Sequence, residues 1–194
     1  MSSEDRVKPP IEAYDDGYFP PAFKGGRGDT LIVGVEVSPE LHVERVALSR
    51  VRVDMNTSMR AIISISRLFE GEVILLDGVT YSGFDIVDPD EVSMETGKSV
   101  IVVFTHPLNL KRIEDALSKH FEDWRDRYAV IERVYKSTVH FYTPWRYIRL
   151  YIRGLDLSTV RLIFKNTCLY SPVPEPLRLA DKLASSLSNV YFPL

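Results

Sequence analysis

Two short, uninterrupted apolar runs constrain the fold most strongly. Residues 72–76 read EVILL and residues 99–104 read SVIVVF. Runs of this length without alternation are typical of strands that are buried on both faces at the centre of a parallel sheet. The segment between them opens with Asp88-Pro89 and is followed by Gly97, which predicts a helix over residues 88–96. Strand, helix and strand in this order favour an α/β protein.

The flanking segments extend this pattern. Strands are predicted at 11–14, 30–37, 41–53, 138–142 and 147–153, and helices at 58–69, 107–123, 156–166 and 177–189. Residues 124–135 fit either a helix or a strand. Antiparallel strands near the start, followed by parallel ones, are the order of a ribonuclease H-like domain. We therefore expect one ribonuclease H-like α/β domain over residues 1–194, with a mixed central sheet and helices on its faces.

The composition excludes several other classes. A chain of 194 residues that is 45% hydrophobic and 26% charged is not disordered. The single cysteine, Cys168, excludes a disulfide framework and a multi-cysteine zinc site, and it suits the reducing cytoplasm. No apolar run approaches the ~18–20 residues of a membrane span, and residues 1–10 lack the apolar core of a signal peptide. We expect a cytoplasmic protein without a membrane partner.

The net charge of −3 conceals an uneven distribution. Residues 133–165 hold seven Lys and Arg against one Asp, a sum of +6, and residues 166–194 sum to zero, so residues 1–132 carry −9. Aromatic residues interleave the basic stretch, and cations with aromatic rings suit phosphates and bases of a nucleic acid. We expect Arg146, Arg149 and Arg153 to follow a DNA backbone and Trp145 to stack on a base. A solvated basic strand face is the alternative for each of these residues.

Acidic residues stand where predicted strands end. Asp15 and Asp16 end the first strand, Asp54 ends the third, and Asp77 ends the run EVILL just before Gly78. Neighbouring strands lie ~4.8 Å apart, so acids at their ends can converge on one or two cations. Oxygen ligands of this kind suit Mg²⁺ or Mn²⁺, and two such ions can promote phosphodiester cleavage. Ordinary turn chemistry is the alternative reading for each acid.

The run LDGVTYSGFDIVD, from Leu76 to Asp88, resembles the signature of the archaeal endonuclease dU family, whose relatives carry Asp-Gly-(Ile/Val)-Thr-(Phe/Tyr)-x-Gly-Phe-Asn-Val-Val-Asp. The similarity extends to Tyr14–Phe19 and to Pro174–Arg178, and it covers nearly the whole chain. Three departures stand out. Relatives often place a basic residue just past the strand that ends here at Phe104, where this chain has Thr105 and His106. Asp85 replaces the usual Asn, and residues 53–58 read VDMNTS where relatives have Val-Asp-Gly-Leu-Asp-Ala-Thr.

The resemblance implies a relative of endonuclease V: a metal-dependent endonuclease that nicks DNA containing deaminated bases, deoxyuridine in particular, in DNA repair. By order along the chain, Asp15, Asp16, Asp54 and Asp77 match the acids of endonuclease V and would hold Mg²⁺ or Mn²⁺. Glu175 begins the final helix, where ribonuclease H-like domains often add a last active-site residue. Arg178 beside it, and His106 past the strand 99–104, are expected to contact DNA.

Two alternatives remain at this point. The chain could be a non-catalytic nucleic-acid-binding protein of the same fold, or a structural or partner-binding α/β domain whose acids serve only as turn residues.

Overall fold

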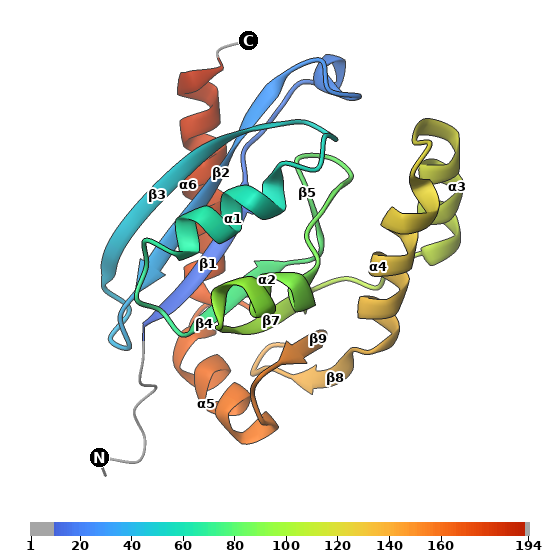
Figure 1. The fold of residues 1–194 in the computed structure, drawn as a ribbon. Coiled ribbons are helices and arrows are strands. Elements are labelled where there is room, and N and C mark those ends of the chain that lie inside the picture. Colours follow the sequence, from blue (N-terminus) through green and yellow to red (C-terminus); the bar gives the residue numbers. More distant parts are fainter. Residues whose placement is uncertain (1–9, 193–194) are drawn as a thin grey trace.

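A mixed sheet runs through the centre of the computed structural model, which describes residues 10–192 (Figure 1). Within these residues the sheet has seven strands: β1 (Ile11–Asp16), β2 (Asp29–Val37), β3 (Val43–Arg52), β4 (Val73–Asp77), β7 (Ser99–Phe104), β8 (Val139–Tyr142) and β9 (Tyr147–Arg153). A separate small hairpin consists of β5 (Thr80–Tyr81) and β6 (Asp85–Ile86). The ends of the predicted domain, residues 1–9 and 193–194, lie outside the described part.

Helices cover both faces of the sheet. They are α1 (Ser58–Ser66), α2 (Pro89–Thr96), α3 (Leu110–His120), α4 (Trp124–Lys136), α5 (Leu157–Thr167) and α6 (Glu175–Tyr191), and a 3-10 turn spans Pro21–Phe23. None of the helices in residues 10–192 combines the length and the apolar character that a membrane span requires.

The strand order confirms the predicted mixed sheet. It is β3-β2-β1-β4-β7-β9-β8, with β4 parallel to both β1 and β7, and every other neighbouring pair antiparallel. An antiparallel β1–β2–β3 meander followed by parallel strands is the order expected of a ribonuclease H-like domain. The carboxyl ends of β1, β4 and β7 therefore lie along one edge of the sheet.

The two central apolar runs are buried on both sides, as predicted. Leu75 and Ile101 lie in the core under α5 and α6, whereas Leu76 and Val102 lie in the core under α1, α2 and α4. Because side chains alternate along a strand, each run supplies both cores. This is why neither run shows the alternation of an exposed strand.

Three segments differ from or complete the expectations. Residues 124–136 form a helix, α4, which buries Ile131 and Val134 at helical spacing. The predicted helix over 107–123 begins only at Leu110, because the Asn109 side chain accepts a hydrogen bond from the Arg112 N–H and caps it there. The β5–β6 hairpin was not predicted, since strands of two residues show no periodicity.

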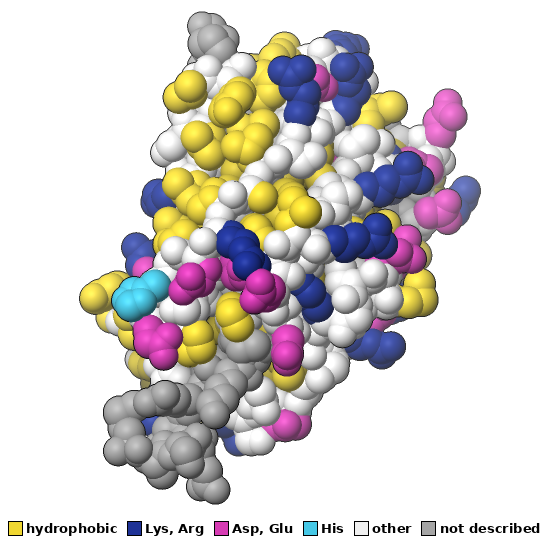
Figure 2. All heavy atoms as spheres, turned by 60° about the vertical axis from the view of Figure 1, so that its left-hand side comes forward, with side chains coloured by type: hydrophobic (Ala, Val, Ile, Leu, Met, Phe, Trp, Pro, Cys, Tyr) yellow, Lys and Arg dark blue, Asp and Glu magenta, His cyan; other side chains and the backbone are white. Residues whose placement is uncertain are grey.

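The outer strand β3 leaves apolar side chains exposed. Val43, Val46 and Leu48 point to the α6 side of the sheet, but α6 packs over β1 and β2. Figure 2 brings forward the left-hand side of Figure 1, where β3 lies. Hydrophobic side chains reach the surface there, with Lys and Arg among them. Charged residues on an outer strand, here Glu44, Arg45 and Arg50, discourage edge-to-edge pairing.

Gly34 on β2 provides a test of the packing under α1. A Cβ at this position would lie 2.6 Å from Cε1 of Tyr14 and 2.8 Å from Cγ2 of Ile65. We expect Gly34→Ala to lower the free energy of unfolding by about 1–3 kcal/mol, the usual cost of overpacking a core. Urea denaturation would measure it, with Ser186→Ala on the exposed side of α6 as the control. Equal stability of the two variants would contradict the packing described here.

Candidate functional site

Asp15 and Asp77 stand side by side at the carboxyl ends of β1 and β4. The parallel register pairs Tyr14 with Leu76, so Asp15 and Asp77 form the next pair beyond it. Ala13 and Leu75, two residues earlier, lie in the core beneath α5 and α6. Because successive side chains alternate between faces, Asp15 and Asp77 both point to the α6 side, on strands about 4.8 Å apart. The structure therefore brings these two predicted residues together.

A third acid, Asp181 on α6, faces this pair. Burial is the larger cause, and the negative charge of Asp181 also raises the pKa of both Asp15 and Asp77, while its Oδ2 lies 2.8 Å from Nζ of Lys182. The helix comes this close because Gly17 has no side chain: a Cβ there would lie 2.7 Å from the Ser188 Cβ. Sequence reasoning missed Asp181. The available signal was its place beside the apolar stripe of the last helix, which packs on the sheet.

Burial and nearby negative charge together raise the pKa of both acids. Burial, followed by the charges of Asp16, Asp77 and Asp181, raises the pKa of Asp15 to about 8. The Asp77 side chain has exposed surface, but many protein atoms surround it in a hollow and limit its hydration. This loss of hydration, followed by the charge of Asp181, raises the pKa of Asp77, whereas His106 lowers it. Like charges at this spacing oppose ionisation unless a cation or a proton lies among them.

Asp16 points to the opposite face of β1. Its Oδ2 accepts a hydrogen bond of 2.8 Å from the backbone N–H of Ser82, in the turn between β5 and β6. Burial raises the pKa of Asp16 to about 6, although this hydrogen bond favours the charged form. Asp16 thus attaches the β5–β6 turn to the end of β1.

Asp54 directs its carboxylate elsewhere. It follows β3 in a left-handed conformation (φ 65°), and its two carboxylate oxygens accept hydrogen bonds from the backbone N–H groups of Gly25 (2.8 Å) and Phe84 (2.7 Å). Its own N–H donates to the Ser82 carbonyl at 2.9 Å. The backbone of Asp54 therefore adjoins the turn that Asp16 also holds, but its side chain lines a different cavity from that of Asp77.

Two buried charged side chains hold the β5–β6 turn in place. Oδ2 of Asp85 accepts hydrogen bonds from the N–H groups of Thr57 and Ser58 and from the Ser58 hydroxyl, so it caps the start of α1. Arg127 on α4 donates to the carbonyls of Phe84 (2.6 Å) and Asp54 (3.2 Å). The segment from Leu76 to Asp88, which resembles the family signature, therefore stabilises the fold as well as lying close to the acids.

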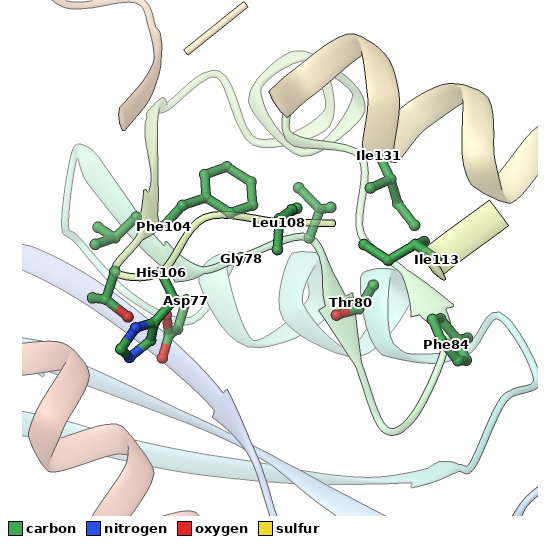
Figure 3. Close-up of a pocket in the computed structure, with 12 residues that line it drawn as sticks. Asp77, Gly78, Thr80, Phe84, Phe104, His106, Leu108, Ile113 and Ile131 are labelled. Atoms are coloured by element: carbon green, nitrogen blue, oxygen red, sulfur yellow. The ribbon is translucent and has the colours of Figure 1, made fainter. Parts of the chain in front are cut away.

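A hollow of about 380 Å³ opens beside Asp77. Asp77 and His106 lie together at one end of it, whereas Ile113 and Ile131 line the other end, and Phe84 forms part of its wall (Figure 3). His106 follows β7 and is exposed, so the structure places it beside an acid at the candidate site.

Glu175 and Arg178 lie elsewhere on α6. They form an ion pair of 2.6 Å with each other. The charge of Glu175, with burial as the larger cause, raises the pKa of the Cys168 thiol to about 12. Glu175 precedes Asp181 by six residues, or about 9 Å along a helix. The α6 acid that adjoins Asp15 and Asp77 is therefore Asp181, and the structure does not bring Glu175 to them.

The predicted DNA-binding arginines of β9 separate along the strand. Arg149 pairs with Phe104 at the edge that bears the acids, where its guanidinium lies 4.7 Å from the Tyr135 ring centroid and donates to Thr138. Arg153 pairs with Val100, near the opposite edge, and its Nε is 3.5 Å from Oδ1 of Asp90. Only Arg149 is brought near the candidate site.

The turn between β8 and β9 presents an exposed group of aromatic and basic side chains at the same edge. The rings of Tyr142 and Tyr147 lie 4.9 Å apart, Trp145 is 53% exposed, and Arg146 is exposed beside them. The indole N–H of Trp145 donates to the Cys168 carbonyl at 3.5 Å. Trp145 and Arg146 therefore lie at the same edge of the sheet as the acids.

The donor set fits a hard divalent cation. Within residues 10–192, no three His, Cys, Asp or Glu side chains converge closely enough to hold an ion by themselves. Mg²⁺ does not require such a cage, because it often takes one or two carboxylates and fills its other positions with water and substrate phosphate. Asp15 and Asp77 offer two carboxylates of this kind, and both have a raised pKa, although His106 lowers that of Asp77.

Comparisons with solved structures define the class of fold. A protein of unknown function from Archaeoglobus fulgidus superimposes with a TM-score of 0.76 at 21% identity, over 92% of this chain and 97% of the other. Human ENDOV gives 0.61 at 12% identity, over 98% and 91% of the two chains. Endonuclease V of Ciona intestinalis, in complex with a DNA containing an inosine followed by a ribo-adenosine, gives 0.55 at 15%, over 90% and 83%. The chain has an endonuclease V-like, ribonuclease H-like fold.

Sequence comparison then assigns the family. The profile of endonuclease dU matches residues 10–188. UPF0215 proteins of Thermococcus gammatolerans and Pyrococcus furiosus are 37% and 35% identical over 189 and 188 residues, and each alignment covers 94% of both chains. The protein belongs to the endonuclease dU family, which confirms the resemblance seen in the sequence. Family and fold together support a nuclease.

The raised pKa of Asp15 predicts how stability depends on pH. The unfolded carboxyl loses its proton near its ordinary pKa, whereas the folded one keeps it up to about pH 8. Without divalent ions, stability should therefore fall as pH rises from about 4 to 8 and level off above. Urea denaturation at pH 5, 7 and 9 measures this dependence. Asp15→Asn should flatten it, and an unchanged pH dependence in that variant would disprove the assignment.

Proposed function

We propose that this protein is a divalent-metal-dependent endonuclease that nicks DNA containing deaminated bases such as deoxyuridine, and that it acts in DNA repair in the cytoplasm. The observation that most supports this proposal is the group formed by Asp15, Asp77 and Asp181. Burial and the neighbouring negative charges raise the pKa of Asp15 and Asp77. A resident cation would relieve that repulsion. The membership in the endonuclease dU family supports the reaction type.

Asp15 and Asp77 would hold Mg²⁺ or Mn²⁺, with Asp181 close by. When bound, such an ion supplies positive charge that stabilises a phosphodiester during hydrolysis. The other roles at the site belong to side chains of the protein itself. His106 lies beside Asp77 and would contact a phosphate, and Asp16 keeps the β5–β6 turn against the end of β1 through Ser82.

The proposed substrate rests on the neighbours and on the surface at the β8–β9 turn. The Ciona endonuclease V was seen with DNA that contains inosine, the nucleoside whose base is deaminated adenine. Exposed Tyr142, Trp145 and Tyr147 offer rings for unpaired bases, and Arg146 offers charge for phosphates. A deaminated base pairs poorly, so it costs less to unstack than an intact one.

A second candidate is a nucleic-acid-binding protein of the same fold without nuclease activity. The observation that favours it is that, among residues 10–192, no three potential ligands converge as they stand. Isothermal titration with Mn²⁺ separates the two candidates. The nuclease should bind the ion and lose binding in Asp15→Asn, whereas the binding protein should give no heat of binding.

We expect Asp77→Asn to lower nicking of a uracil-containing duplex at least 100-fold in the presence of Mg²⁺ or Mn²⁺, because the amide removes a charge from the cation site. Wild-type activity should disappear with EDTA and return with added metal. The matched control is Asp115→Asn, which changes an exposed acid on α3 whose partner is Lys111. If Asp77→Asn nicks as fast as wild type, the proposed site is wrong.

The separation of the arginines predicts unequal effects on DNA binding. Arg146→Ala should weaken binding and make the dependence of log affinity on log salt shallower by about 0.9, the contribution of one phosphate contact. Arg153→Ala should leave both unchanged, because Arg153 lies near the opposite edge beside Asp90. Fluorescence anisotropy over a salt series measures both values. An equal loss in the two variants would refute this orientation of the DNA.

A further inference from the structure

A second cavity, of about 560 Å³, lies on the other side of the β5–β6 turn from the hollow beside Asp77. Segments far apart in the sequence meet there: the loop after β1, the residue after β3, the β5–β6 turn and the end of α3. Its lining includes Phe19, Lys24, Asp54, Phe84, His120 and Phe121. A volume of this size admits a nucleobase with its sugar.

Asp54 is the carboxylate that lines this cavity. The residue is only 5% exposed, and the N–H groups of Gly25 and Phe84 fix the orientation of its side chain. A carboxylate offers about four acceptor positions, so two remain for a ligand. A buried acceptor with free positions selects a partner that presents an N–H.

The walls suit a flat aromatic ring. Phe84 and Phe121 are in edge contact, with ring centroids 5.8 Å apart, and the guanidinium of Arg127 lies 4.4 Å from the Phe121 centroid on that ring. Arg127 also donates to the Phe84 carbonyl, so both rings are held in place. Lys24, Arg27 and His120 are exposed around the cavity and can meet carbonyl oxygens or phosphates.

We infer that this cavity receives the unstacked deaminated base, and that Asp54 reads it by accepting a hydrogen bond from the ring N–H. This inference rests on the proposed function and deepens it. Uracil and hypoxanthine carry an N–H at the ring position where their parent bases, cytosine and adenine, carry an acceptor lone pair. A carboxylate favours the first pair and repels the second, because a site built to hydrogen-bond a group rejects the analogue that lacks it. Thymine and guanine carry this N–H as well, so the contact separates each deaminated base from its parent only.

One turn couples this cavity to the metal-binding acids. Ser82 donates its N–H to Asp16 and accepts from the N–H of Asp54, and Phe84 lines both the cavity and the hollow beside Asp77. A base held by Asp54 therefore lies a short span of backbone away from a phosphate at Asp77. In this inference Asp54 determines base specificity, whereas the family resemblance had implied that it binds the metal ion.

The test uses binding, so that it does not depend on cleavage. Asp77→Asn protein is titrated by fluorescence anisotropy with three duplexes of one sequence, which place uracil, 3-methyluracil or cytosine opposite guanine. The methyl group removes the N–H and keeps both carbonyls. We expect uracil to bind at least tenfold more tightly than the other two. Because 3-methyluracil cannot pair, a protein that senses only weak pairing would bind it at least as well as uracil.

The variant arm adds Asp54→Asn to the same background, with Asp126→Asn on α4 as the control. Asp54→Asn should reduce the preference for uracil over 3-methyluracil, because its single oxygen must serve the donors that two oxygens serve in Asp54, and the control should retain it. Since Asp54 also holds backbone, Phe121→Leu supplies a second change that leaves the carboxylate in place and should weaken uracil binding. Thermal melting verifies that each variant folds.

Equal binding of uracil and 3-methyluracil, or an undiminished preference in Asp54→Asn, overturns the inference. The outcomes also separate it from the proposed nuclease. If the protein prefers uracil but wild type does not nick DNA, the proposed nuclease function is wrong and base recognition by Asp54 is supported. If wild type nicks at uracil but the protein binds uracil no more tightly than 3-methyluracil, only base recognition by Asp54 is refuted.

Discussion

The parallel pairing of β1 with β4 is the constraint on which the candidate site depends. It sets Asp15 beside Asp77 on one face of the sheet edge, where α6 brings Asp181 against them. Burial and mutual repulsion raise the pKa of Asp15 and Asp77, although Lys182 pairs with Asp181 and His106 partly offsets the charge at Asp77. Such an arrangement is costly for stability when the acids are charged, so the packing of the sheet sets up the proposed cation site.

The β5–β6 turn is the second element of the site, and it depends on buried polar side chains. Asp16, Asp85 and Arg127 hold it from three directions through backbone groups of Ser82, Ser58 and Phe84. These hydrogen bonds explain why so short a hairpin has a defined position between two cavities. They also explain why the residues from Leu76 to Asp88 read as one signature, since the run ends a central strand, forms the turn and caps α1.

Much of the fold was predictable because it follows from local patterns. The runs EVILL and SVIVVF became β4 and β7, and the last helix, the antiparallel start and the mixed sheet were all expected. Asp15 and Asp77 were selected because acids at parallel strand ends meet at one edge. Asp181 and the separation of Arg149 from Arg153 were not predictable, since they depend on how α6 and β9 dock on strands distant in sequence.

The sequence by itself determined the α/β class, the family and the strand ends at which acids gather, because hydrophobic periodicity and turn residues act over a few neighbouring positions. Tertiary structure decided which acids share a site. Asp54 ends a strand as Asp15 and Asp77 do, but its strand lies at the edge of the sheet, and the N–H groups of Gly25 and Phe84 orient its carboxylate into a second cavity. Hydrogen bonds between segments 29 and 30 residues apart set that direction, and no local pattern reports them.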